Sequence, residues 1–325
     1  MPLICIKDIA ITPGSKVLVR CDLDVPVVDG KVVDTFRLKA CLDTLKFIIA
    51  AKAIPVILGS LGRPDGVDES LSTKHLKSFF DDGLGGSYEL LENCRFDPRE
   101  KLGDMGYAKE LVEKSGATLF VNESFGMNHR AYTSIVTLPK LLPSYAGFTL
   151  HNEVLNLSKV IKSPARPLVA IIGGAKLESK KPIVTKFVEI ADYVLVGGKI
   201  GLEWDTYVPQ NLFLPLDYSD ETKKDIGIKT AEAYTKLIKR SATVVWAGPL
   251  GFFEDGNYCL GTNSIAQAVT SSSAFSVAGG GDTIHALTKS GLLGKFSFVS
   301  TGGGAMLEFL IHGNLPGLLA LGYNQ

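Results

Sequence analysis

Hydrophobic residues recur along this chain in short unbroken runs rather than in strict alternation with polar residues. Eight such runs lie at residues 16–19, 55–58, 119–121, 168–172, 193–196, 243–246, 275–278 and 296–299. Continuous apolar runs of this length are typical of strands that are buried on both faces of a sheet. The pattern therefore predicts eight strands in parallel sheets.

Helical periodicity fills several stretches between these runs. One apolar stripe consists of Leu38, Leu42, Leu45, Ile48 and Ile49, and another of Ala231, Tyr234, Leu237 and Ile238. Alternation of apolar runs with helical stretches is typical of strand–helix–strand units with right-handed crossovers. The predicted fold class is therefore α/β.

The length of the chain indicates two domains. It has 325 residues, 46% of them hydrophobic, which is more than one core usually holds. A helical stretch near 151–161 is followed by the prolines Pro164 and Pro167, which end a helix. We expect a first domain at 1–150, a connecting helix and linker at 151–167, and a second domain at 168–325. The last residues could pack back on the first domain.

Composition and charge narrow the class of protein. Lys plus Arg and Asp plus Glu both number 34, so no basic excess favours a nucleic-acid surface. The five cysteines are scattered without a Cys-x-x-Cys pair, which predicts core thiols in a reducing compartment. No signal-peptide pattern is found, and no apolar stretch reaches the ~18 residues of a membrane span. We expect a cytoplasmic protein.

The two halves carry different chemistry at the ends of their predicted strands. Six of the eight arginines precede the proposed boundary, whereas paired and tripled glycines at strand ends follow it. In parallel sheets, ligands bind beyond the carboxyl ends of the strands. The first half therefore presents arginines at that edge, and the second presents bare backbone.

Two glycine triplets in the second half, Gly279–Gly281 and Gly302–Gly304, each follow a strand and precede a helix. Glycine allows a phosphate to approach the free N–H groups of a helix N-terminus, although a tight turn would also use glycine. Asp282 follows the first triplet and could hold Mg²⁺ beside a phosphate. Its alternative role is an N-cap for the helix that begins near Thr283.

Lysines accompany a third glycine-rich strand end, Gly173-Gly-Ala-Lys176-Leu-Glu-Ser-Lys180. Lys176 and Lys180 are four residues apart, so on a helix they share one face. They could meet two parts of a polyphosphate, or they could form an ordinary solvated face.

The sequence lacks the signatures of several common enzyme classes. It contains neither G-x-x-x-x-G-K-[ST] nor G-x-G-x-x-G, which argues against a Walker-type NTPase and a nicotinamide dehydrogenase. It also contains neither H-E-x-x-H nor G-x-S-x-G, the signatures of zinc proteases and serine hydrolases.

Four arginines of the first half, Arg37, Arg63, Arg95 and Arg130, lie at a helix start or in predicted loops near strand ends. Arginine is preferred where a phosphate or carboxylate is bound by two parallel hydrogen bonds. Any one of them could form a surface ion pair. Together they favour a small anionic substrate.

These motifs, in this order, resemble the phosphoglycerate kinase family. The resemblance runs from Val17 to about Ala320. It rests on "VLVRCDLDVPVVDGKVVDTFRLKA", "LGRPDG", "LLENCRFDP", "VNESFGMNHRAY", "AIIGGAKLESK", "VVWAGPLGFFE", "AGGGDT" and "VSTGGGAMLEFL".

The resemblance implies two Rossmann-like domains with parallel sheets, joined by a helix and hinge. The first would bind 3-phosphoglycerate or 1,3-bisphosphoglycerate, and the second Mg-ADP or Mg-ATP. The implied activity is the glycolytic, reversible transfer of a phosphoryl group between 1,3-bisphosphoglycerate and ADP. Hinge closure and electrostatic stabilisation of the transferred group would assist it. The implied protein is a monomer that acts on small molecules, with no nucleic-acid or membrane partner.

The resemblance also implies roles for individual residues. Substrate binding falls to Asp22, Asp24, Arg37, Ser60, Arg63, Arg95 and Arg130. Nucleotide binding falls to Gly174, Ala175, Lys176, Lys180, Gly198, Pro249, Glu254, Gly281, Asp282 and Thr283, with Glu254 on the ribose and Asp282 on Mg²⁺. The transferred group would meet Arg37, Lys180, Gly280 and Gly303, where the N–H groups of 302–304 would face it.

The sequence departs from the family pattern in several places. The chain is shorter than usual, chiefly between Trp204 and Lys229. Ser60, Asp24, Ser179, Ala247 and Lys199 stand where the family has histidine, asparagine, aspartate, asparagine and glycine. A carboxylate at Asp24 should weaken anion binding unless an arginine compensates, and Lys199 could either add positive charge or block the nucleotide pocket.

Two functions of different class follow. The first is a compact, working phosphoglycerate kinase. The alternative is a family member that binds nucleotide or anions but has lost efficient transfer and acts as a binding or regulatory protein.

Overall fold

The protein, seen in a computed structural model that describes residues 2–175 and 177–324, consists of two compact units. The first extends to Leu155 and also includes the residues from Asn314 onward, and the second is Asn156–Gly313. Helix α4 (Phe148–Lys162) contains the point at which the first unit passes into the second.

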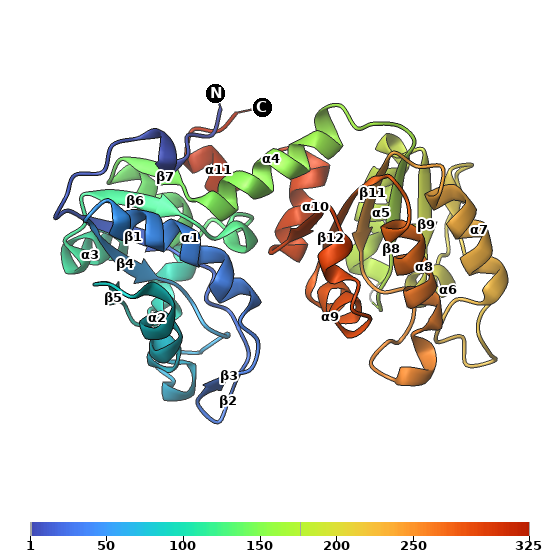
Figure 1. Ribbon diagram of the computed structural model, residues 1–325, viewed down its shortest axis with the longest axis horizontal. Helices are drawn as coiled ribbons and strands as arrows, with labels where there is room; N and C mark the ends of the chain where they lie inside the picture. Colours follow the sequence, from blue (N-terminus) through green and yellow to red (C-terminus); the bar gives the residue numbers. More distant parts are fainter. Residues whose placement is uncertain (1, 176, 325) are drawn as a thin grey trace. The chain divides into compact units, whose positions relative to one another are not determined.

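The first unit is built on a five-stranded parallel sheet (Figure 1). Its strand order is β5-β4-β1-β6-β7, with strands at Glu89–Leu90, Ile54–Leu58, Lys16–Arg20, Leu119–Asn122 and Ser144–Ala146. Its helices are α1 (Phe36–Ala50), α2 (Lys77–Leu84), α3 (Met105–Ser115), the start of α4, and α11 (Pro316–Ala320). A short hairpin, β2 (Val27–Val28) with β3 (Lys31–Val32), lies between β1 and α1 along the chain.

The second unit is built on a six-stranded parallel sheet. Its order is β10-β9-β8-β11-β12-β13, with strands at Leu212–Phe213, Tyr193–Val196, Leu168–Ile172, Thr243–Ala247, Phe275–Gly279 and Phe298–Ser300. Its helices are α5 (Leu177–Ile190), α6 (Gly198–Leu202), α7 (Ile228–Ile238), α8 (Leu260–Thr270), α9 (Gly281–Lys289) and α10 (Gly303–His312).

The predicted strands and the α/β class are confirmed. All eight apolar runs correspond to strands, namely β1, β4, β6, β8, β9, β11, β12 and β13, and every pair in the two large sheets is parallel. The sequence pattern missed β2, β3, β5, β7 and β10, which have only two or three residues each. Strands this short lack enough residues to show a period.

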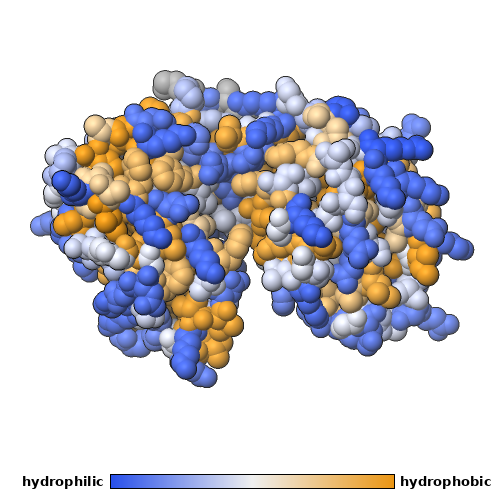
Figure 2. Space-filling view, viewed as in Figure 1, coloured by the Kyte–Doolittle hydropathy of each residue, from blue (hydrophilic) through white to orange (hydrophobic). Residues whose placement is uncertain are grey.

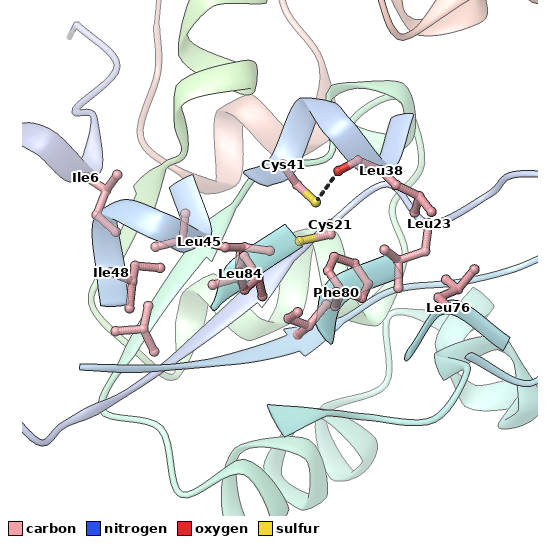
Figure 3. Packing of buried hydrophobic residues seen from close by; sticks show 14 of the residues in the cluster. Ile6, Cys21, Leu23, Leu38, Cys41, Leu45, Ile48, Leu76, Phe80 and Leu84 are labelled. Atoms are coloured by element: carbon pink, nitrogen blue, oxygen red, sulfur yellow. Dashed lines mark hydrogen bonds between the residues drawn. The ribbon is translucent and has the colours of Figure 1, made fainter. Parts of the chain in front are cut away.

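The core of the first unit explains why α1 forms where it does. Leu38, Leu45 and Ile48 of α1 are fully buried and pack in one cluster with Phe80 of α2 (Figure 3). Burial of each such side chain contributes about 1.5–3 kcal/mol. In the same view, the Sγ of Cys41 donates a 3.1 Å hydrogen bond to the carbonyl oxygen of Leu38.

The cysteines are free, as predicted. Cys5, Cys21, Cys41 and Cys94 are buried, and Cys259 is partly buried. Burial raises the pKa of the Cys21 thiol, to which its neighbour Cys41 also contributes. These thiols are packing groups rather than parts of a disulfide framework.

A buried carboxyl group, Glu123, lies just after β6. Its Oε1 accepts 3.0 Å hydrogen bonds from the Thr44 hydroxyl and from the Thr149 N–H in the first turn of α4, while its buried Oε2 has no partner in the described part of the chain. A Cβ on Gly147 would collide with Oε2. Burial raises the pKa of Glu123 from 4.5 to about 8, against the hydrogen bonds from Thr149 and Thr44.

The substitution Glu123→Gln should make the protein more stable at neutral pH. The folded state holds a proton that the unfolded state releases above pH 4.5, so stability falls as pH rises from 4.5 towards 8 and then levels off. The amide has no proton to release, so the stability advantage of the variant should grow to about 3 kcal/mol at pH 7. Urea unfolding at pH 5, 6, 7 and 8 measures it. Glu113→Gln, at an exposed site on α3, is the control, and an advantage that does not change with pH would contradict the assignment.

The C-terminal segment supports a loop of the first unit. The N–H of Gly317 in α11 donates a 2.9 Å hydrogen bond to the carbonyl oxygen of Asn128. A Cβ on Gly317 would collide with the Asn128 side chain, so glycine is required for this approach. The end of the chain thereby holds the loop that leads to Arg130.

The surface mixes hydrophilic and hydrophobic side chains on both units (Figure 2). Exposed apolar residues include Val28 and Val33 at the β2–β3 hairpin and Tyr207 in the second unit. Isolated exposed apolar side chains of this kind are normal on proteins. Among the described residues, no helix has both the length and the apolar character that crossing a membrane requires.

Candidate functional site

The first unit brings its strand ends together at one edge. In the parallel register, Arg20 of β1 is opposite Leu58 of β4 and Asn122 of β6. The loops that follow these strands therefore start side by side. They carry Asp22, Asp24, Ser60, Arg63 and Arg130.

Arg37 lies in the first turn of α1 and reaches the loop after β1. Its Nη1 donates a 3.0 Å hydrogen bond to the carbonyl oxygen of Asp24 and lies 3.7 Å from Oδ1 of Asp22. The Asp22 side chain is nearly buried, whereas Arg37 is one-third exposed. The guanidinium is thus oriented by the loop and still accessible to a ligand.

Asp24, which stands where the family has asparagine, has a hydrogen-bond donor and an arginine nearby. Its Oδ1 accepts a 2.9 Å hydrogen bond from the N–H of Gly62, and its Oδ2 lies 3.9 Å from Nη1 of Arg95. Arg95 lies in a short 3-10 turn and donates to the carbonyl oxygen of Gly62 at 2.5 Å and to Sδ of Met127 at 3.3 Å. An arginine therefore accompanies the added carboxylate.

Arg63 and Arg130 are the accessible arginines of this edge. Both are exposed, and neither guanidinium forms a hydrogen bond or an ion pair with any residue that the structure describes. Five bonded protons on each remain available to an anion. The four predicted arginines thus fall into two groups, Arg37 and Arg95 held by protein atoms and Arg63 and Arg130 open to solvent.

Sequence reasoning missed the part played by Arg20. This fully buried arginine ends β1, and its guanidinium donates to Ser134 Oγ at 2.8 Å, to Ser60 Oγ at 3.2 Å and to the Cys21 carbonyl oxygen. Ser60, which is buried, is therefore oriented by Arg20. An arginine directly after an unbroken apolar strand was the available signal, because a buried charge needs partners.

The second unit also aligns its strand ends. Ala247 of β11 is opposite Ile172 of β8 and Gly279 of β12, and Gly279 is opposite Ser300 of β13. The glycine-rich loops after these strands therefore lie along one edge of the sheet, as the motif positions predicted.

The two glycine triplets pack directly against each other. Gly280 has φ = +102°, and a Cβ on Gly303 would lie 2.5 Å from the Cα of Gly280. Glycine at these positions is thus explained by backbone packing. Gly281 and Gly304 are different, because a Cβ on either would meet nothing within 4 Å. The missing side chains there leave open space at the N-termini of α9 and α10.

Asp282 is not an N-cap, so that alternative is wrong. The N-cap of α9 is Gly280, and Asp282 lies in the first turn without capping it. Burial lowers the pKa of the Lys180 ammonium group in α5. The negative charge of the Asp282 carboxylate opposes this shift. Thr283 is buried and accepts a 2.7 Å hydrogen bond from the N–H of Gly248. Thr283 thus joins the loop after β11 to the start of α9.

A cavity of about 520 Å³ lies at this glycine-rich edge. Its lining includes six residues expected to bind nucleotide, namely Gly174, Ala175, Gly198, Pro249, Glu254 and Asp282. Lys180, Gly281 and Thr283 adjoin Asp282 but do not line the cavity, and Lys176 lies outside the described residues. A volume of this size is typical of small-molecule sites.

The remaining lining residues were not predicted, apart from Lys199. They are Leu202, Thr222, Lys223, Lys224, Gly251 and Phe252. Lys199 lines the cavity without closing it, and its ammonium is paired with Glu203 at 3.0 Å. Residues 222–224 belong to none of the motifs recognised in the sequence, so nothing marked them as lining a cavity. Ala247 is buried at the end of β11, so its methyl group is a packing group.

The two edges carry different groups. The first has guanidinium groups, and the second has the N-termini of α9 and α10, the Lys180 ammonium and the Asp282 carboxylate. The Asp282 carboxylate would repel a phosphate by itself. A divalent cation can bind a carboxylate and phosphate oxygens together, so this edge suits a phosphate that carries such a cation. Among the described residues, no cluster of three or more His, Cys, Asp or Glu could hold a metal without such a ligand.

Comparison with known proteins gives one consistent result. The family model described as "Phosphoglycerate kinase" matches residues 6–86, 80–205 and 215–313. Phosphoglycerate kinases of Borreliella burgdorferi (strain ZS7) and Thermus thermophilus are 32% and 34% identical, over 97% and 95% of this chain and 98% and 97% of their own lengths.

Solved structures agree with these relatives. Phosphoglycerate kinase from Coxiella burnetii has a TM-score of 0.87 at 29% identity, covering 99% of both chains. That from Pyrococcus horikoshii has a TM-score of 0.84 at 26% identity, covering 98% of both chains. The alignment with the Borreliella burgdorferi protein spans 388 positions against 325 residues here, so that relative carries additional segments.

Proposed function

Because this chain belongs to the phosphoglycerate kinase family, we propose that its first unit binds the phosphoglycerate and its second binds the nucleotide. The chain is a phosphotransferase that moves a phosphoryl group reversibly between 1,3-bisphosphoglycerate and ADP, giving 3-phosphoglycerate and ATP. The observation that carries the proposed division is the glycine-lined cavity with Asp282 at its wall in the second unit.

Phosphoglycerate binding is assigned to the arginine edge. Arg63 and Arg130, which are free of protein partners in the described chain, would bind the phosphate and carboxylate oxygens by paired hydrogen bonds. Arg37 and Arg95 would complete the site with Asp22 and Asp24, and buried Ser60 would support the wall of the site through Arg20. Asp24 is tolerated because Arg95 accompanies it.

Nucleotide binding is assigned to the cavity. The bare backbone of Gly174, Ala175 and Gly198 would let the nucleotide approach closely, and Pro249 and Glu254 would contact the nucleoside, with Glu254 on the ribose. The phosphates would lie towards Gly281, Asp282 and Thr283, at the start of α9. Helix N-termini favour this arrangement because their N–H groups are unpaired.

Mg²⁺ is proposed as the metal that accompanies the nucleotide, and Asp282 would hold it. Mg²⁺ commonly uses one or two carboxylates together with phosphate oxygens and water, which matches a single carboxylate at the cavity wall. When bound, the ion would neutralise charge on the phosphate oxygens. Lys180, in a half-buried position near Asp282, would add a second cation.

The transferred group needs positioning and charge stabilisation more than covalent help. Arg37 and Lys180 would contact its oxygens, and the N–H groups of Gly303 and Gly304 together with Gly280 would bind the developing negative charge. The Gly302 N–H instead donates a 3.2 Å hydrogen bond to Ser300 Oγ. Direct transfer requires the two bound substrates to meet in line and away from water, so closure of the protein during the reaction is part of the proposal.

The remaining assignments follow from charge and family. We propose a monomeric, cytoplasmic enzyme whose partners are these small molecules and not nucleic acid, in keeping with a net charge of zero. The alternative of a member that binds ligands without efficient transfer gains no support from the site, since Arg95 accompanies Asp24 and Lys199 leaves the cavity open.

A coupled assay tests the proposed function. The purified chain is mixed with Mg-ATP and 3-phosphoglycerate, and the 1,3-bisphosphoglycerate formed is reduced by its dehydrogenase with oxidation of NADH. We expect steady NADH oxidation that requires both substrates. If the folded chain binds Mg-ATP but no NADH is oxidised, the proposed kinase activity is wrong and the alternative of a binding protein is accepted.

A further inference from the structure

Asp225 is a buried carboxylate behind the wall of the nucleotide cavity. It directly follows Lys224, which lines the cavity, and only 1% of the residue is exposed. A Cβ on Gly251, another lining residue, would collide with Oδ1 of Asp225. Glycine at position 251 therefore lets the loop after β11 pack directly on the carboxylate. The proposed transfer does not itself use this group.

The Asp225 carboxylate caps helix α8 from outside that helix. Its Oδ2 accepts a 2.8 Å hydrogen bond from the N–H of Gly261 in the first turn of α8, and its Oδ1 accepts a 2.9 Å hydrogen bond from the N–H of Ile226. Cys259, the N-cap residue, makes no capping hydrogen bond through its side chain in the described part of the chain. Unpaired N–H groups and the positive end of the helix dipole favour a negative charge here. Asp225 thereby fixes the start of α8 to its own segment.

Thr262 extends this connection from α8 to the loop after β11. Its buried Oγ accepts hydrogen bonds from the N–H groups of Leu250 and Gly251 at 3.1 and 3.2 Å. The loop then returns to the first segment through Phe252, whose N–H donates a 2.8 Å hydrogen bond to the carbonyl oxygen of Lys224. The two segments and the start of α8 therefore form a closed ring of hydrogen bonds.

This ring of hydrogen bonds supports the nucleoside end of the cavity. Three of its members, Lys224, Gly251 and Phe252, line the cavity, as does Glu254, which is proposed to contact the ribose. The Lys224 ammonium lies 5.7 Å from the ring centre of Phe252, so the two parts of the wall also meet through their side chains. The phosphates are proposed to lie towards Gly281, at the start of α9. A displacement of the ring should therefore affect the nucleoside and not the phosphates.

Ionised Asp225 is held at a cost to stability. Burial raises the pKa of this carboxyl from 3.8 to about 6, against the hydrogen bonds from Gly261 and Ile226. The carboxyl is therefore mostly ionised at pH 7, and stability falls as the pH rises from 3.8 to 6, because only the unfolded state releases the proton there. Groups kept at such a cost are typical of functional sites.

We propose that Asp225 is a positioning residue of the nucleotide cavity, which holds its own segment and the loop after β11 at one separation so that the nucleoside meets a preformed wall. The inference rests on the proposed function, because it takes the cavity to be the nucleotide site. A preformed wall raises affinity because less chain must be ordered when the ligand binds. Asp225 acts through the residues around it and needs no contact with the nucleotide.

The substitution Asp225→Asn tests this. The amide oxygen can accept from only one of Gly261 and Ile226, since the NH₂ group would face the other N–H. Isothermal titration should show the affinities for ADP and adenosine lowered by the same factor of about ten, as expected when one buried N–H loses its acceptor. The affinity for Mg-pyrophosphate should not change. In the coupled assay, KM for ATP should rise by a similar factor, whereas kcat and KM for 3-phosphoglycerate should equal those of the parent.

Asp192→Asn is the matched control in the same unit. Asp192 is also a structural carboxylate, which accepts a 2.6 Å hydrogen bond from the N–H of Leu168 and is paired with Arg166 at 2.9 Å. These contacts lie at the start of β8, at the opposite end of that strand from the cavity. Asp192→Asn should lower stability and leave the affinity for ADP unchanged.

A second pair of variants tests the ring without changing Asp225. Thr262→Val removes the hydroxyl that accepts from Leu250 and Gly251 with little change in shape, so it should weaken ADP and adenosine equally, as Asp225→Asn does. Thr262→Ser keeps the hydroxyl and should bind both ligands as the parent does. Should Asp225→Asn fail to fold, this pair decides the question.

Several outcomes would overturn the inference. Unchanged ADP affinity in Asp225→Asn or in Thr262→Val would mean that the wall does not depend on the ring. A loss that extends to Mg-pyrophosphate, or that Asp192→Asn shares, would mean that the unit is loosened as a whole. A parent chain that binds ADP and transfers no phosphoryl group would overturn the proposed function, and the binding measurements would still decide the role of Asp225.

Discussion

Replacing Arg37 with alanine should lower kcat by about three orders of magnitude and leave the fold intact. A guanidinium that stabilises the charge of a transferred phosphoryl group is worth about 10³-fold or more in kcat. Two local contacts orient Arg37, to the carbonyl oxygen of Asp24 and to the Asp22 carboxylate, while one-third of its side chain stays exposed. The coupled assay at saturating substrates measures the loss.

Arg37→Lys and Arg99→Ala complete this experiment. Lysine keeps the charge but cannot form two parallel hydrogen bonds, so we expect it to recover only part of the activity. Arg99 belongs to the same unit and is paired with Asp97 at 2.7 Å and Glu110 at 2.8 Å, away from the proposed site. Its replacement should change activity little and stability by less than ~1 kcal/mol. A wild-type kcat in Arg37→Ala would remove this residue from the transfer step.

Replacing Asp282 with alanine should lower kcat/KM for the nucleotide by about 10³-fold, because the Mg²⁺ proposed to accompany the phosphates would lose its proposed protein ligand. Asp282 serves no capping role whose loss would unfold α9, since Gly280 is the N-cap. The variant should therefore unfold at nearly the parent temperature. Titration of activity with Mg²⁺ measures the effect, and the half-saturating concentration should rise sharply.

Glu232→Gln provides the matched control for Asp282. Glu232 is an exposed carboxylate on α7 of the same unit, and its neutralisation should leave the Mg²⁺ titration unchanged. Asp282→Glu keeps the charge on a longer side chain and should retain more activity than alanine. An Asp282→Ala variant with the parent's Mg²⁺ dependence would show that the metal is held elsewhere.

The alternation of apolar runs and helical stripes was sufficient to predict the α/β class. Buried parallel strands need apolar residues on both faces, so β1, β8 and β11 are visible in the sequence as unbroken runs. The edge strands β5 and β10 could not be recognised in the sequence, because two residues cannot show a period. Local pattern therefore determined the centre of each sheet but not its margins.

Part of the site was also readable from residue types at strand ends. Arginines after β4 and β6, and glycines after β8, β12 and β13, predicted anion binding because parallel strands end together at one edge. The family resemblance then supplied a reaction that these two edges can perform. That step needed only motifs and their order.

Only the tertiary structure showed which contacts each of these residues makes at the strand ends. Spacing alone could not tell whether Asp282 caps a helix or faces a cavity, and only the position of Gly280 settled this. The pairing of Asp24 with Arg95 and the burial of Arg20 beside Ser60 join residues far apart in the chain. Lys223 and Lys224 line the cavity, although none of the motifs recognised in the sequence includes them. The sequence determines local periods and the order of motifs, whereas charge compensation and cavity walls depend on which distant segments pack together.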